Sequence, residues 1–118
     1  MTSFEELQKL TLQWADDKDL LYEENADKQF MKFIEEVFEF KSEFDLRNMF
    51  SDNDFARKDM KLEMGDIFVT LIILCEQLGL DPVKCLEMAY EKIKDRKGKT
   101  IGGNFYKQED LEGKKWEK

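Results

Sequence analysis

The chain has 118 residues, of which 42% are hydrophobic and 39% are charged, and its formal net charge is −8. This length is typical of one domain, so we expect a single domain over residues 1–118, with a core over about 4–96 and a tail over 97–118. An acidic surface repels nucleic-acid phosphates, which argues against nucleic acid as a partner. The absence of histidine excludes Ser-His-Asp and Cys-His nucleophile systems and histidine-ligated metal sites.

The sequence predicts a cytoplasmic protein that does not enter a membrane. The N-terminus lacks the basic start and the apolar run of a signal peptide. The longest apolar stretch, residues 67–75, is too short to span a bilayer. Cys75 and Cys85 lie in apolar helical sequence, so we expect them to be reduced core residues.

A first helix is predicted over about residues 4–18. Ser3 with Glu6, or Thr2 with Glu5, fits a capping box, and apolar residues follow at helical spacing. Trp14 on this helix is interpreted as a core or interface residue, with ligand stacking as the alternative. A polar connection over residues 16–25 follows.

A second helix is predicted over about residues 26–47, with two parallel stripes. The apolar stripe consists of Phe30, Phe33, Val37, Phe40 and Phe44. The polar stripe consists of Gln29, Lys32, Glu36, Glu39 and Glu43. A solvated face is the usual role of such a polar stripe, and a functional face is the alternative.

After a short turn over residues 48–54, a third helix is predicted over about 55–78. Its second half is apolar nearly all round, so it must be covered on most sides, and we expect oligomerisation to provide the cover. A polar line remains on this helix, formed by Glu63, Asp66, Thr70 and Gln77.

Gly79 is predicted to end the third helix, and Asp81-Pro82 to begin a fourth over about residues 82–94. A basic cluster over residues 94–99 follows. It either complements the helix dipole or binds phosphate oxygens. Gly102-Gly103 then predicts a turn before a short extended run, and residues 109–118 are expected to be charged and frayed.

The carboxylates of the second and third helices indicate a metal site. Glu36 and Glu39 are three residues apart, as are Glu63 and Asp66, so each pair shares a helix face. The short turn makes the two helices antiparallel neighbours, and like charges at ~4 Å repel by roughly 4 kcal/mol per pair at an effective dielectric of 20. A cation bound between the carboxylates turns this repulsion into a net attraction. Oxygen ligands favour Mg²⁺ or Mn²⁺ over zinc or copper.

The order Glu35-Glu36-x-x-Glu39 followed by Glu63-x-x-Asp66 resembles the E-E-x-x-E…E-x-x-D signature of the MazG-like all-α nucleoside triphosphate pyrophosphohydrolases. The resemblance covers roughly residues 10–110, including the turn over 78–81 and the segment 89–99, and is strongest to small phage-type and bacterial members. Glu91 departs from the pattern, because many relatives carry Asn there.

This resemblance implies an all-α fold of four main helices, completed by dimerisation or as a dimer of dimers, with a short glycine-rich C-terminal extension. It implies Mg²⁺-dependent cleavage of a nucleoside triphosphate to the monophosphate and pyrophosphate, with Mn²⁺ as a possible substitute. The implied metal ligands are Glu36, Glu39, Glu63 and Asp66, and the implied catalytic residues are Glu35, Glu36 and Glu39. The implied substrate contacts are Gln29, Lys32, Lys92, Lys94, Arg96 and Lys99.

Two other functions fit the same sequence. The chain is alternatively a catalytically weak relative that serves as a helical interaction module, or an acidic helical structural protein without a metal. An EF-hand is excluded, because Asp52-Asn53-Asp54 is not followed by the glycine and closing Glu of that loop.

Overall fold

The computed structural model describes residues 2–49 and 54–114 of the chain. These residues divide into two compact units, Met1–Pro82 and Val83–Lys118, each of which is described by itself. The elements of the N-terminal unit are α1 (Phe4–Asp17), a 3₁₀ turn (Glu23–Asn25), α2 (Ala26–Met49) and α3 (Asp54–Gln77). The next elements are α4 (Pro82–Ile93), β1 (Gly98–Ile101), β2 (Asn104–Lys107) and α5 (Gln108–Lys114).

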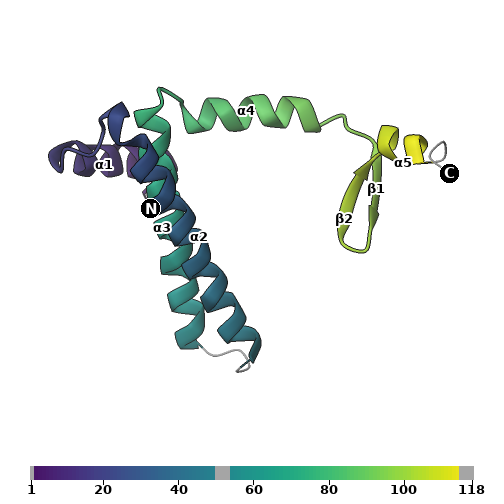
Figure 1. The fold of residues 1–118 in the computed structure, drawn as a ribbon, viewed down its shortest axis with the longest axis horizontal. Coiled ribbons are helices and arrows are strands. Elements are labelled where there is room, and N and C mark those ends of the chain that lie inside the picture. The colour runs from purple at the N-terminus through teal and green to yellow at the C-terminus, as the bar shows by residue number, and fades with distance from the viewer. Residues whose placement is uncertain (1, 50–53, 115–118) are drawn as a thin grey trace. The chain divides into compact units, whose positions relative to one another are not determined.

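In the N-terminal unit, α2 and α3 form an antiparallel pair that lies side by side along most of its length (Figure 1). Helix α1 packs against α3 near one end of this pair. The rings of Phe4 and Phe68 meet edge to face, with their centroids 6.3 Å apart. The pairing of α2 with α3 places the two polar stripes on neighbouring helices.

Helix α1 begins and ends with defined caps. The Ser3 hydroxyl accepts a hydrogen bond from the Glu6 amide at 3.1 Å, so the structure selects Ser3 from the two predicted capping boxes. At the other end, Asp19 takes a positive φ of 57°, and the Leu20 N–H donates to the Ala15 carbonyl at 2.9 Å. This pattern is a Schellman cap, and it turns Leu20 back toward the helix.

Helix α3 ends in the same way, and here glycine supplies the positive φ. Gly79 has φ of 70°, its N–H donates to Glu76, and the Leu80 N–H donates to the Cys75 carbonyl at 2.8 Å. The predicted role of Gly79 as the end of the third helix is therefore confirmed.

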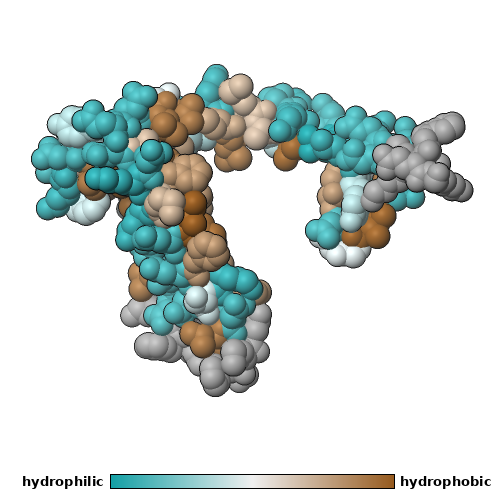
Figure 2. Space-filling model, in the orientation of Figure 1, coloured by the Kyte–Doolittle hydropathy of each residue, from teal (hydrophilic) through white to brown (hydrophobic). Residues whose placement is uncertain are grey.

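The core is small and is centred on the second half of α3. Among the described residues, the buried apolar side chains are Ala15, Ile72, Ile73, Leu74 and Cys75. In the apolar stripe of α2, Phe33, Phe40 and Phe44 are half-buried, whereas Phe30 and Val37 are exposed. Apolar side chains are accordingly visible on the surface of the N-terminal unit (Figure 2).

The C-terminal unit contains an antiparallel hairpin that the sequence predicts only as a turn with an extended run. Gly102 and Gly103 have φ of 59° and 82°, the two consecutive positive values that a tight hairpin turn requires. Gly98 pairs with Lys107, and a Cβ at Gly98 would collide with the Tyr106 carbonyl oxygen. Glycine is therefore needed both in the turn and where the strands approach closely.

The structure confirms the mostly helical prediction and the four long helices, but it differs from the prediction in two further places. Residues 108–114 form α5, although a frayed end was expected there. Cys85 is exposed, so its predicted core position is wrong; both cysteines are free, as expected. The predicted turn over residues 48–54 falls largely outside the described residues. Within the described part of the chain, every helix is too short or too polar to cross a membrane.

Candidate metal centre

Three of the predicted metal ligands come together between α2 and α3. Glu36 and Glu39 project from α2 and Glu63 from α3, and each contributes one carboxylate oxygen to a group whose members all lie within 4.8 Å of one another. We refer to Glu36, Glu39 and Glu63 as the carboxylate cluster. One turn of spacing on α2 and the antiparallel pairing with α3 are sufficient to assemble it.

Two oxygens of the carboxylate cluster are buried without a hydrogen-bond partner. Glu36 is buried and Glu63 is half-buried, and Oε2 of each is inaccessible and unpaired within the described residues. A buried carboxylate oxygen without a donor costs free energy, because it loses its water without gaining a replacement. Glu39 is exposed, so the cluster has an open side. This donor set fits a hard divalent cation, which bonds to oxygen and accepts further ligands from solvent.

Lys32 is a weak counter-ion for the carboxylate cluster. Its Nζ lies 3.6 Å from Glu36 and 3.8 Å from Glu35, and its side chain is 56% exposed. Exposed ion pairs at such distances contribute little to stability. Lys32 therefore leaves most of the negative charge of the cluster uncompensated.

The mutual repulsion of these carboxylates acts on the pKa of Glu63. Burial raises the pKa of Glu63 above the ordinary glutamate value, and the charges of Glu39, Asp66 and Glu36 raise it further. Both causes disfavour the ionised form of Glu63 in the folded chain. A bound cation would favour the ionised form of Glu63 and so lower its pKa.

Asp66, the fourth predicted ligand, lies outside the group of three within 4.8 Å. It lines a hollow of about 250 Å³ together with Glu36. The other lining residues are Trp14, Leu20, Gln29, Lys32, Val69, Thr70 and Ile73. The structure thus brings the predicted substrate contacts Gln29 and Lys32 to the same hollow as two of the predicted ligands.

Hydrogen bonds from two glutamines hold lining residues of this hollow, Thr70 and Leu20, in place. The Gln29 amide donates to the Thr70 carbonyl at 3.1 Å, which ties α2 to α3. The Gln77 amide donates to the Leu20 carbonyl at 2.6 Å, which holds the chain after α1 against the end of α3. Gln29 therefore shapes the hollow through a structural hydrogen bond.

We compared the chain with models of protein families, with curated proteins and with solved structures. None of them matches it. The chemistry of the carboxylate cluster is therefore inferred from its own geometry, burial and charge.

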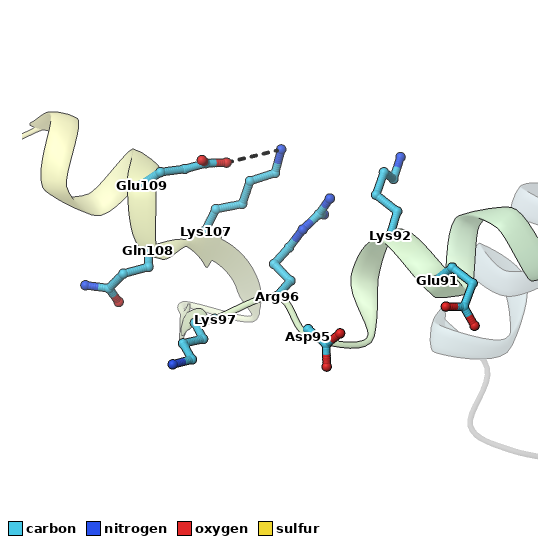
Figure 3. A pocket seen from close by; sticks show the side chains of 8 residues that line it. All are labelled: Glu91, Lys92, Asp95, Arg96, Lys97, Lys107, Gln108 and Glu109. Atoms are coloured by element: carbon cyan, nitrogen blue, oxygen red, sulfur yellow. Dashed lines mark ion pairs between the residues drawn. The ribbon is translucent and has the colours of Figure 1, made fainter.

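Four of the five basic residues predicted to contact substrate belong to the C-terminal unit, where they separate into two groups. Lys92 and Arg96 line a hollow of about 570 Å³ (Figure 3). Lys94 is held by Glu91 at 2.8 Å. Lys99 lies on β1 opposite Tyr106 and does not line this hollow.

Two residues that line these hollows, Lys107 and Trp14, were not predicted as site residues from the sequence. Lys107 on β2 joins Lys92 and Arg96, and only the pairing of β1 with β2 brings it near them. Trp14 is 52% exposed and lines two hollows, so it lies outside the core of this chain, and of its predicted roles an interface contact and ligand stacking stay predictions. Its apolar helical spacing gave no signal that distinguishes a buried indole from one that lines a site.

Proposed function

We propose that this chain is a Mg²⁺-dependent nucleoside triphosphate pyrophosphohydrolase, which converts an NTP or dNTP to the monophosphate and pyrophosphate. The observation that supports this most is the carboxylate cluster, whose three residues each place one oxygen within 4.8 Å of the others. Glu36 and Glu63 also each carry a buried oxygen that has no partner among the described residues. An all-oxygen donor set favours Mg²⁺, or Mn²⁺ as a substitute. The order of the acidic residues along α2 and α3, which resembles the MazG-like signature, adds the reaction type.

Glu36, Glu39 and Glu63 would hold the cation, and Asp66 in the adjacent hollow is a further oxygen donor. Bound Mg²⁺ would offset the carboxylate charges and stabilise negative charge on phosphate oxygens. Glu35 is exposed beside the cluster, and we assign it, with a neighbouring carboxylate, to orienting and deprotonating the attacking water.

The hollow beside the cluster offers groups that suit a nucleotide. The indole of Trp14 provides an aromatic face for a base, and Val69 and Ile73 add apolar wall. Lys32 supplies a positive charge at the same hollow, where it can contact a phosphate oxygen. Base and phosphate contacts are thus available within the N-terminal unit.

The activity assay uses a panel of canonical, deoxy and oxidised nucleoside triphosphates, with Mg²⁺ or Mn²⁺. We expect at least one of them to yield its monophosphate and pyrophosphate in a one-to-one ratio, and a chelator to stop the reaction. Release of orthophosphate alone, or no release from any nucleotide, would contradict the proposed reaction. The second outcome would favour the alternative of a helical interaction module.

We also propose that a second copy of the chain covers the apolar surface of the N-terminal unit. Large apolar side chains are exposed on all three long helices of this unit, among them Leu10, Phe38 and Leu62. A further apolar hollow of about 380 Å³ between α1 and α3 is lined by Leu7, Leu10, Thr11, Trp14 and Val69. Large apolar side chains exposed in this number, together with an apolar hollow, indicate an interaction surface.

Sedimentation velocity over a series of protein concentrations tests this assembly. We expect a homodimer or a dimer of dimers at micromolar concentration, because covering the apolar helices removes their surface from water. A monomer that persists throughout the series would contradict the assembly without bearing on the metal site.

A further inference from the structure

Three positively charged side chains of the C-terminal unit line one hollow. Lys92 comes from the last turn of α4, Arg96 from the segment after it and Lys107 from the end of β2. Figure 3 shows the three side chains extending to the same side of the chain, while Asp95 and Lys97 extend to the other. The sequence separates Lys107 from Arg96 by the whole hairpin, so folding creates this grouping.

Backbone contacts fix these three positions relative to one another. The Arg96 N–H donates to the Ile93 carbonyl at 3.0 Å, which turns the chain sharply after α4. The Gln108 N–H donates to the Lys97 carbonyl at 2.8 Å, and Gly98 pairs with Lys107. Arg96 and Lys107 are half-buried, so their stems are partly ordered before any ligand arrives.

The acidic neighbours only partly compensate this positive charge. Glu109 lies 4.0 Å from the Lys107 Nζ, and its side chain is 76% exposed, so this ion pair is weak. Glu91 extends to the opposite side in Figure 3 and pairs with Lys94. The side of the hollow that holds Lys92, Arg96 and Lys107 therefore keeps an excess of positive charge within an acidic chain.

We propose that this hollow binds a small polyphosphate anion of the size of pyrophosphate, that Lys107 is one of its ligands, and that binding requires no metal. Lysine and arginine are the side chains that bind phosphate oxygens through charge-assisted hydrogen bonds. A volume of about 570 Å³ lies within the range of small-ligand sites, about 300–1,000 Å³. Three positive side chains on one side of the hollow suit a compact anion, whereas the net charge of −8 repels a long polyanion such as nucleic acid.

The test is calorimetric titration of the full chain with inorganic pyrophosphate in the presence of EDTA. Lys107→Gln should weaken binding about tenfold, because it removes one charge-assisted hydrogen bond. Lys99→Gln is the matched control: it removes the same charge from the same hairpin but outside the hollow, and it should change affinity by less than about twofold. Glu109→Gln should tighten binding, since it releases Lys107 and removes a negative charge.

Three outcomes would overturn this inference. These are no binding of pyrophosphate by the unmodified chain, equal weakening by Lys107→Gln and Lys99→Gln, and no tightening by Glu109→Gln. The titration contains no divalent metal, so its result is independent of whether the carboxylate cluster supports nucleotide hydrolysis. Glu39→Gln should accordingly leave pyrophosphate binding unchanged.

Discussion

Replacement of Glu39 by Gln should abolish nucleotide hydrolysis and weaken binding of Mn²⁺, used as the spectroscopic substitute for Mg²⁺, by about 100-fold or more. The substitution keeps the shape of the side chain and removes one charged oxygen donor from a group within 4.8 Å. Glu39 is the exposed member of the cluster, so the change creates no new buried polar group. Electron paramagnetic resonance of Mn²⁺ and pyrophosphate release measure the two effects.

Glu43→Gln is the matched control for this prediction. Glu43 lies one turn further along the same polar stripe of α2, is half-buried and stands outside the carboxylate cluster. Both variants should keep the helical circular dichroism of the unmodified chain. Hydrolysis by Glu39→Gln at the unmodified rate would contradict the assigned site, as would equal losses in the two variants.

Removal of divalent metal should make the free energy of unfolding fall as the pH rises. Burial and the charges of Glu39, Asp66 and Glu36 raise the folded-state pKa of Glu63, so the folded chain retains a proton that the unfolded chain has already released. Between the ordinary glutamate pKa and this raised value, the folded state binds more protons, and stability decreases with increasing pH. Urea unfolding in EDTA at a series of pH values measures the slope, and Glu63→Gln should flatten it.

Addition of Mg²⁺ at neutral pH should restore the stability that is lost in this way. A cation that binds only the folded state at about 100 times its Kd contributes about 2.7 kcal/mol. For a unit of this size, that corresponds to an increase in Tm of roughly 10 °C or more. Glu63→Gln should show a higher Tm than the unmodified chain in EDTA and a much smaller response to Mg²⁺. A Tm that does not respond to Mg²⁺ in the unmodified chain would contradict the metal site.

The long helices were predictable because the signals that define them are local. Apolar spacing located α1 to α4 to within a few residues, Ser3 marked the start of α1, and Gly79 marked the end of α3. The same periodicity placed Glu36 and Glu39 on one face, and the short connection predicted that Glu63 would approach them. The structure confirms that these three carboxylates meet.

The features of the site that were not predicted from the sequence depend on contacts between side chains or on strand pairing. Glu63 and Asp66 share a helix face, yet only Glu63 lies within 4.8 Å of the two glutamates of α2, because that contact depends on where α2 crosses α3. Lys94 belongs to the basic cluster but is paired with Glu91 within its own helical turn. Lys107 becomes a neighbour of Arg96 only through the hairpin. The spacing of residues along the chain does not determine which of them come into contact.

The pairing of α2 with α3 and of β1 with β2 has a kinetic consequence. Each pairing joins consecutive elements, so the loops that must close during folding are short and the relative contact order is low. We therefore expect both units to form rapidly, whereas the proposed assembly with a second copy would require an encounter between chains and would depend on concentration. A newly synthesised chain would thus have its carboxylates in place while its apolar helices are still uncovered. During that interval, aggregation would compete with the proposed assembly.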